Sequence, residues 1–168
     1  MPCRNVRKTL GNNHQMNFSA RMLGLVLTLC VATGCASAGG GANWVELQGK
    51  RFTVEIADDD AERARGLMFR DELAAGSGML FIHDDEAPQA YWMKNTKIPL
   101  DILYFDRSRK LVSASERVPP CSAGDQCPPF PSKGPALYVL ELNAGAVESL
   151  GVKPGDELLF GPTIPKRP

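Results

Sequence analysis

Histidine is scarce in this sequence, and the scarcity excludes several kinds of active site. The chain has two histidines, His14 and His83, and only His83 lies after residue 44. A histidine-rich metal centre and a catalytic relay that needs a second histidine are therefore excluded. No serine–histidine pair accompanies the other polar residues, so the sequence offers no nucleophile and base of that kind.

The chain also lacks an excess of basic residues. It carries 19 Lys and Arg against 19 Asp and Glu, and four of the basic residues lie before residue 44. From Trp44 onward the remaining 15 basic residues (19 less 4) face all 19 acidic ones, which leaves a formal charge of −4. Nucleic-acid binding needs a basic surface, so no nucleic-acid partner is expected.

No apolar run is long enough to span a membrane as a helix of the mature protein. The longest, Met22–Ala32, follows Arg21 and is typical of the apolar core of a secretory signal. The polar stretch before it is long for such a signal, and Met16 begins a better-proportioned one. The sequence therefore predicts export, with Met16 as an alternative start of the chain.

The end of this run resembles the lipobox of bacterial lipoproteins. Small residues lead to Cys35 in Ala32-Thr33-Gly34-Cys35, and in such proteins the cysteine is acylated and becomes the new N-terminus. Ordinary cleavage after Ala38, which would release a soluble secreted protein, remains the alternative. With lipidation, the protein is expected to be anchored in the cell envelope on the periplasmic side. It would contact the membrane only through its lipid.

Composition divides the chain into four parts. Residues 1–38 form the leader, and the glycine-rich stretch 39–43 forms a flexible tether. Residues 44–160 form one folded domain, and residues 161–168 form a frayed tail. A monomer is expected.

Cysteine is rare in the predicted domain. Cys3 and Cys30 leave with the leader, and Cys35 carries lipid or is cleaved away. The remaining pair, Cys121 and Cys127, is expected to form a structural disulfide in an exported protein. A redox role is disfavoured because the spacing is not Cys-x-x-Cys and prolines stiffen the loop.

Hydrophobic patterning predicts a mainly β (α+β) domain, an antiparallel barrel or sandwich with two or three short helices. Asp59 is expected to cap a short helix, and Asn143 a second one that ends before Gly151. Residues 119–135 read as a long, proline-rich loop, and 83–88 as a polar turn. The expected strands are 52–56, 78–82, a central hairpin over 91–105, 111–118, 137–142 and 157–160.

Several short motifs together resemble domain-of-unknown-function family 192, over about residues 50–160. The resemblance implies a small, often exported, mainly β protein without an established activity, substrate or cofactor, so it supplies no catalytic residue. The motifs are Gly66-Leu67-Met68, Gly78-Met79-Leu80-Phe81, Trp92-Met93-Lys94-Asn95-Thr96, Ile98-Pro99-Leu100-Asp101-Ile102, Pro120-Cys121 with Cys127, Val139-Leu140-Glu141-Leu142 with Ala144-Gly145, and Gly155-Asp156.

Polar residues beside the central hairpin are the first candidates for a site. Lys94 and Asp101 flank its tight connection, with Trp92 and Asn95 next to Lys94, and Glu141 lies in another apolar strand. Such a cluster would bind a hydroxyl-rich ligand or perform acid–base chemistry. The alternative is a salt bridge and turn network that only fixes the hairpin.

Two further site hypotheses rest on residue type. Met68, Met79 and Met93 with His83 would suit Cu(I), although methionine more often fills gaps in a core. Exposed aromatic side chains would form a sugar-stacking platform, although they too are more often core residues. The candidates for the platform are Tyr91, Trp92, Tyr104 and Tyr138.

These observations favour an exported module, without a cofactor, that binds a small ligand or an envelope component. The alternative is a glycan-active hydrolase or lyase that uses Lys94, Asp101 and Glu141. The less favoured alternative is copper binding.

Overall fold

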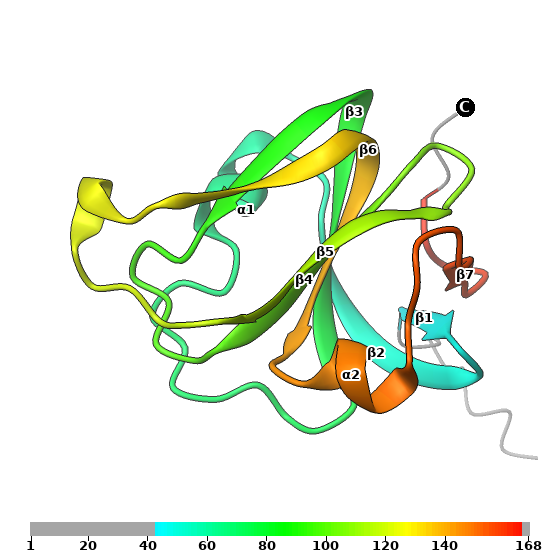
Figure 1. Cartoon of the computed structure of the whole chain (residues 1–168), viewed down its shortest axis with the longest axis horizontal. Coiled ribbons are helices and arrows are strands. Elements are labelled where there is room, and N and C mark those ends of the chain that lie inside the picture. The colour runs from blue at the N-terminus through cyan, green and yellow to red at the C-terminus, as the bar shows by residue number, and fades with distance from the viewer. Residues whose placement is uncertain (1–42, 166–168) are drawn as a thin grey trace, which may run out of the picture. The chain divides into compact units, whose positions relative to one another are not determined.

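Seven strands form one mixed sheet in the computed structural model, which describes residues 43–165 (Figure 1). The predicted leader, Cys35 and residues 166–168 lie outside the described residues. The mainly β fold class with two short α-helices is confirmed. The elements are β1 (Trp44–Leu47), β2 (Lys50–Ala57), α1 (Asp60–Arg65), β3 (Ser77–Trp92), β4 (Leu100–Phe105), β5 (Leu111–Val118), the 3-10 turn η1 (Gly124–Gln126), β6 (Pro129–Asn143), α2 (Ala146–Leu150) and β7 (Leu159–Phe160).

The strand order corrects the predicted central hairpin. The sheet runs β5-β4-β6-β3-β2-β1-β7, so β6 lies between β3 and β4 and pairs antiparallel with both. The predicted hairpin is wrong because the partner of both strands comes from later in the chain. The expectation that residues 102–105 lie inside the sheet is confirmed, since every residue of β4 is buried.

One pair of strands, β2 and β3, is parallel, and α1 lies in the connection between them. Parallel neighbours require such a crossover. The predicted cap of α1 is confirmed, because the Asp59 carboxylate accepts a hydrogen bond of 2.8 Å from the backbone N–H of Glu62. A capped first turn fixes where the chain leaves β2, and therefore where the following segment, residues 66–69, lies.

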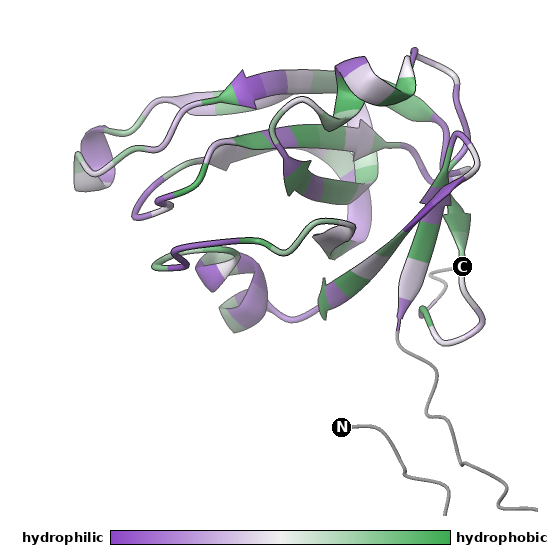
Figure 2. Ribbon diagram, turned by 90° about the horizontal axis from the view of Figure 1, so that it is seen from below, coloured by the Kyte–Doolittle hydropathy of each residue, from purple (hydrophilic) through white to green (hydrophobic). Residues whose placement is uncertain are grey.

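The two faces of the sheet bury separate hydrophobic clusters. One contains Leu103 and Leu140, which are opposite each other on β4 and β6, and also Val147 of α2. The other contains Ile102 and Tyr104 on the opposite face, with the segment after α1 packed over it. Figure 2 shows hydrophobic residues along the strands of the curled sheet. Successive residues of one strand therefore belong to different cores.

The strands β3 and β6 continue beyond the rest of the sheet as a long two-stranded ribbon toward the disulfide loop (Figure 1). The predicted turn at 83–88 and the predicted loop at 129–135 are both strand, with irregular register between Ile82 and Ala90. The prolines of β6 in this ribbon, Pro129, Pro131 and Pro135, occur at odd positions only. The N–H donors that these prolines lack would all lie on one edge of the strand. The other edge therefore keeps its donors and can pair.

The C-terminal part differs from the prediction at the start of α2 and in the tail, whereas the predicted end of α2 before Gly151 is confirmed. Gly145, rather than Asn143, occupies the N-cap position, and the Asn143 amide instead donates to the Leu73 carbonyl at 2.8 Å. Within the predicted frayed tail, Ile164 is buried in the first core. Within residues 43–165 there is no helix long and apolar enough to cross a membrane.

Candidate functional site

The Glu141 carboxyl group is buried on one face of β6 and has no partner among residues 43–165. Glu141 lies opposite Met79 of β3 and Ile102 of β4, and its exposed fraction is 5%. No residue in the described part of the chain forms a hydrogen bond or ion pair with its side chain. Burial raises the pKa of Glu141 from 4.5 to about 8, because the charged form loses its hydration.

A narrow cavity of about 30 Å³, the Glu141 pocket, lies beside this carboxyl. A water molecule needs roughly 10–15 Å³ of such space, so the pocket admits one small group. Two shallower hollows share residues with the pocket. One, of about 180 Å³, shares Arg63, Tyr91 and Trp92, and the other, of about 250 Å³, shares Thr96. The pocket is lined by Arg63, Ala64, Arg65, Gly66, Leu67, Met68, Phe81, Tyr91, Trp92, Thr96 and Glu141.

Aromatic rings wall the pocket on the β3 side. Phe81 and Tyr91 meet edge to face, with ring centroids 4.9 Å apart and planes at 81°. The Tyr91 hydroxyl and His83 Nε2 are hydrogen-bonded at 3.0 Å. Burial, and then the charge of Glu141, raise the pKa of Tyr91, so this ring remains neutral.

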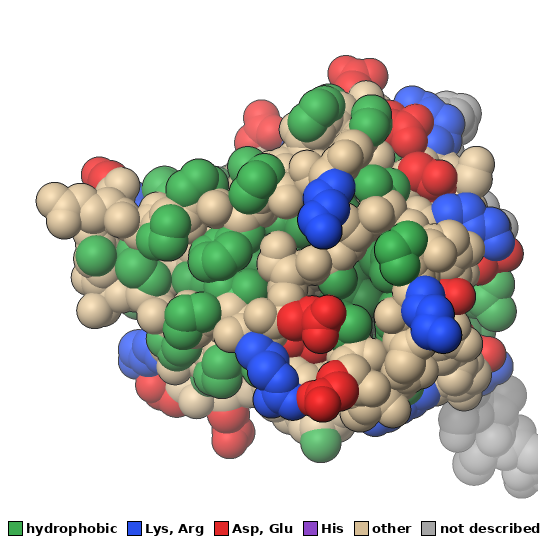
Figure 3. Space-filling view, viewed as in Figure 1, with side chains coloured by type: hydrophobic (Ala, Val, Ile, Leu, Met, Phe, Trp, Pro, Cys, Tyr) green, Lys and Arg blue, Asp and Glu red, His purple; other side chains and the backbone are tan. Residues whose placement is uncertain are grey.

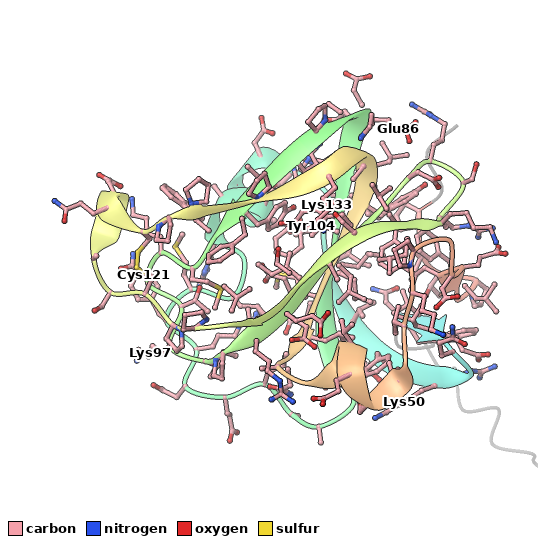
Figure 4. The ribbon with its side chains drawn as sticks, viewed as in Figure 1. Lys50, Glu86, Lys97, Tyr104, Cys121 and Lys133 are labelled. Carbon is pink, nitrogen blue, oxygen red and sulfur yellow. A yellow bond between two sulfur atoms is a disulfide. The ribbon has the colours of Figure 1, made fainter. Side chains whose placement is uncertain are left out.

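Tyr104 lies farther inside, near the centre of the sheet (Figure 4). Its hydroxyl donates to the carbonyl of Phe130. Burial raises the pKa of Tyr104, and the charge of Glu141 raises it further. The charge of Glu141 therefore affects the pKa of both tyrosines, yet neither tyrosine forms a hydrogen bond with it.

Arg63 of α1 joins the helix to β3 at the edge of the pocket. Its guanidinium donates to the carbonyls of Asp58 and Ile82 at 2.8 Å each. It also pairs with Asp60 at 2.6 Å and Asp84 at 3.4 Å. Burial, and then the Arg63 charge, lower the pKa of His83. Arg63 is thus fully engaged, and its contacts fix the segment that lines the pocket.

Trp92 and Phe69 are the exposed aromatic residues near the pocket, with exposed fractions of 42% and 61%. Phe69 was missed by sequence reasoning. Its φ of +64° is rare for a bulky residue, and its backbone N–H donates to the Asn95 carbonyl at 2.8 Å. The signal available in the sequence was its place directly after Gly66-Leu67-Met68. Hydrophobic side chains gather over the half of the molecule that holds the β3–β6 ribbon (Figure 3).

The predicted disulfide between Cys121 and Cys127 is confirmed, with Cα atoms 5.9 Å apart (Figure 4). Cys121 forms β-bridges with Lys94 and Thr96, which dock the disulfide loop against the chain after Trp92. The Lys94 ammonium group pairs with Asp125 of the same loop and lies 4.8 Å from the Trp92 ring centroid. The disulfide loop therefore supports one side of the rim.

The predicted cluster of Lys94, Asp101 and Glu141 does not form. Asp101 is opposite Leu142 across the β4–β6 ladder, whereas Glu141 is opposite Ile102. Cross-strand partners share a face and neighbours in sequence alternate, so Asp101 and Glu141 point to opposite faces of the sheet. The same geometry removes the pair of converging carboxylates that a hydrolase or lyase of this design would need.

Asp101 has a structural role instead. It is fully buried, and its two oxygens accept hydrogen bonds from the backbone N–H groups of Arg117 at 2.7 Å and Val147 at 2.8 Å. Val147 lies in the first turn of α2, so Asp101 provides the cap that Gly145 cannot.

The hypothetical sugar-stacking platform does not form, because Tyr104 and Tyr138 are buried and Tyr91 is hydrogen-bonded inside the pocket. The four residues of the copper hypothesis do not share one setting, and His83 is hydrogen-bonded to Tyr91. Met79 and Met93 pack in the second core, and Met68 lines the pocket. Within residues 43–165 no group of three or more His, Cys, Asp and Glu side chains is arranged to hold a metal ion.

Comparison with known proteins gives a family but no activity. The family model DUF192, described as "Uncharacterized ACR", matches residues 43–160. A crystal structure of a protein of unknown function from Novosphingobium aromaticivorans DSM 12444 is 38% identical, with a TM-score of 0.62 over 69% of this chain and 81% of that one. A protein from Sinorhizobium meliloti 1021, described as a candidate transcription regulator, is 40% identical, with a TM-score of 0.64 over 70% and 92%. No curated protein matches. The chain therefore belongs to domain-of-unknown-function family 192 (DUF192).

Proposed function

We propose that this protein binds a small ligand, or an exposed group of an envelope component, at the Glu141 pocket. The observation that carries the proposal is the Glu141 carboxyl, which has no partner among the described residues and lies beside a cavity that shares lining residues with two larger hollows. A polar group buried without a partner costs folding free energy, and such groups cluster where a ligand later supplies the partner.

The dimensions of the site favour a ligand that inserts one polar group and lays the rest on the rim. The pocket itself, at about 30 Å³, takes only the inserted group. The hollows of about 180 and 250 Å³ beside it have room for the remainder, along Trp92 and Phe69. Aromatic rims and a few convergent polar groups are typical of small-ligand sites.

The Sinorhizobium protein is described as a candidate transcription regulator. The net charge of the present chain does not favour a role in which it would bind DNA. Residues from Trp44 onward have 15 basic residues (19 less 4) against 19 acidic ones. A net negative charge does not attract a phosphate backbone.

Export to the cell envelope is part of the same proposal. It is supported by the apolar run, the lipobox-like Cys35 and the cysteine pair that forms a disulfide. If Cys35 is acylated, Cys35→Ser should release the protein from membranes or leave the uncleaved precursor. Membrane fractionation with acyl labelling tests this, and unchanged processing without label would favour cleavage after Ala38.

A thermal-shift screen tests binding at the pocket. The purified protein is screened against envelope sugars, peptidoglycan fragments and simple amines, beside Glu141→Gln and the surface control Glu148→Gln. A ligand at a hundredfold its dissociation constant adds about 2.7 kcal/mol of stability. We expect a hit that shifts the wild type and Glu148→Gln alike but shifts Glu141→Gln less. Hits that shift all three proteins equally would contradict the proposed site.

A further inference from the structure

The surroundings of the Glu141 carboxyl have the chemistry of a cation site. Three aromatic side chains, Phe81, Tyr91 and Trp92, line the pocket that contains this carboxyl. Phe81 and Tyr91 stand at 81° to each other, so the aromatic lining includes rings in two orientations. Ring faces attract cations, and the attraction strengthens in a desolvated site.

An ammonium group already contacts one wall of the pocket. The Lys94 side chain lies 4.8 Å from the centroid of the Trp92 ring, held there by its ion pair with Asp125. Lys94 does not pair with Glu141, because Asp125 holds its ammonium group at the rim. The Glu141 carboxyl group therefore remains able to bind a cation from a ligand.

The charges that face the pocket do not oppose a cationic ligand. Arg63 is offset by Asp60 at 2.6 Å and Asp84 at 3.4 Å. Arg65 lines the mouth and is exposed to solvent, which screens it. Burial lowers the pKa of His83, which keeps that ring neutral, and Tyr91 and Tyr104 are neutral phenols. Glu141 is thus the one acidic side chain in the lining of this pocket.

We propose that the group received by Glu141 is an ammonium group, so that the ligand is an amine-bearing molecule such as an amino sugar or an amino-acid side chain of the envelope. The inference rests on the proposed function and specifies its chemical class. A small ammonium group fits the volume, donates hydrogen bonds to the carboxylate and lies among the aromatic side chains that line the pocket. A neutral hydroxyl would satisfy only the hydrogen bond.

Binding of an ammonium group has a consequence for protons. The cation favours the ionised carboxylate, so a proton leaves Glu141 as the ligand binds. Because the pKa of free Glu141 is raised to about 8, affinity should rise with pH up to about 8 and then level off. Below that point the expected slope is about tenfold per pH unit for an alkylammonium ligand, such as methylammonium or a lysine side chain, which stays charged throughout because it titrates near 10.4.

The test uses methylammonium chloride as the probe and methanol as its neutral control of similar size. Carbon-detected NMR of protein labelled at the glutamate carboxyl carbons follows Glu141 directly, and sodium chloride matches the ionic strength. We expect saturable shifts of the Glu141 signal with methylammonium, tighter at pH 8 than at pH 6, and none with methanol. Glu141→Gln should weaken the binding about tenfold to a hundredfold, as measured by Trp fluorescence, and Glu148→Gln should leave it unchanged.

The outcomes of these experiments separate this inference from the proposed function. If envelope sugars bind with dependence on Glu141 but methylammonium does not, the ammonium assignment is overturned and the binding site stands. If methylammonium and methanol bind alike, or binding tightens as pH falls, the assignment is also overturned. If neither methylammonium nor any compound of the thermal-shift screen binds, both proposals fail.

Discussion

Asp101 and Glu141 are two buried carboxyl groups on neighbouring strands of one sheet, and they differ in what surrounds them. Asp101 points to the face of α2 and accepts two backbone hydrogen bonds, at 2.7 and 2.8 Å. Glu141 points to the opposite face, beside a cavity, and has no partner among the described residues. Burial alone therefore does not identify a site. The supply of partners distinguishes a carboxylate that holds the fold together from one that can receive a ligand.

The first prediction concerns Glu141→Gln, which keeps the shape and removes the charge. The folded pKa of Glu141, about 8, lies above its ordinary value of 4.5, so between these pH values the folded state holds more protons than the unfolded state. The stability of the wild type should therefore fall as pH rises through this window. At pH 8.5, Glu141→Gln should be more stable than the wild type by on the order of 4 kcal/mol, since each pKa unit is about 1.4 kcal/mol.

Urea unfolding at pH 5 and pH 8.5 measures this effect. The difference between wild type and variant should nearly vanish at pH 5, where the carboxyl is protonated in the folded state. A Glu141→Gln variant that is less stable than the wild type at both pH values would mean that the carboxyl has a stabilising partner.

The matching change at Asp101 should have the opposite sign. Asp101→Asn replaces one acceptor oxygen by an NH2 group, so the N–H groups of Arg117 and Val147 cannot both be accepted. We expect a loss of about 2–3 kcal/mol, the usual magnitude for a hydrogen bond to a charged group. Urea unfolding and the far-UV circular dichroism of the folded state check it. Equal stability of Asp101→Asn and wild type would show that Asp101 is no more structural than Glu141.

A smaller effect is expected from the disulfide that supports the rim. The double change Cys121→Ala with Cys127→Ala opens a loop with a sequence separation of 6. The chain-entropy estimate for such a loop is a loss of roughly 2 kcal/mol. Denaturant unfolding gives the stability, and titration with any screening hit gives the affinity. Because the loop docks on Lys94 and Thr96, the affinity for the ligand should weaken as well. Unchanged affinity would show that the disulfide loop does not contribute to ligand binding.

The smallest effect is expected at Lys94. Its partner Asp125 is 84% exposed, so the ion pair is screened by solvent and Lys94→Met should barely change the urea midpoint. The double variant with Asp101→Asn should be additive, since the two residues share no partner. If the double variant lost clearly less stability than the two single variants together, Lys94 and Asp101 would interact as the sequence predicted.

Local patterns in the sequence predicted much of the fold. The cap at Asp59 depends on residues that are three positions apart, and the burial of β4 depends on six consecutive residues. The family resemblance covers the segment that the DUF192 family model matches. The disulfide followed from a count of cysteines and an inference about export. Each of these features is fixed by neighbours in the sequence or by composition.

The arrangement of the site could not be predicted in the same way. Placing β6 between β3 and β4 brings Glu141 beside Met79, a residue far away in the chain, and no periodicity encodes that register. The face to which Glu141 points depends on that register as well. Sequence reasoning therefore selected Glu141 as a candidate residue but assigned it the wrong companions.

The pKa of Glu141, measured in the ligand-free protein, tests the central claim most directly. Carbon-detected NMR of the labelled glutamate carboxyl groups, assigned with Glu141→Gln, follows its titration between pH 3 and pH 10. An unpartnered buried carboxyl should titrate near pH 8, far above the exposed glutamates. A midpoint at or below the ordinary value of 4.5 would mean that the protein already supplies Glu141 with a partner, and it would contradict both the contrast with Asp101 and the proposed site.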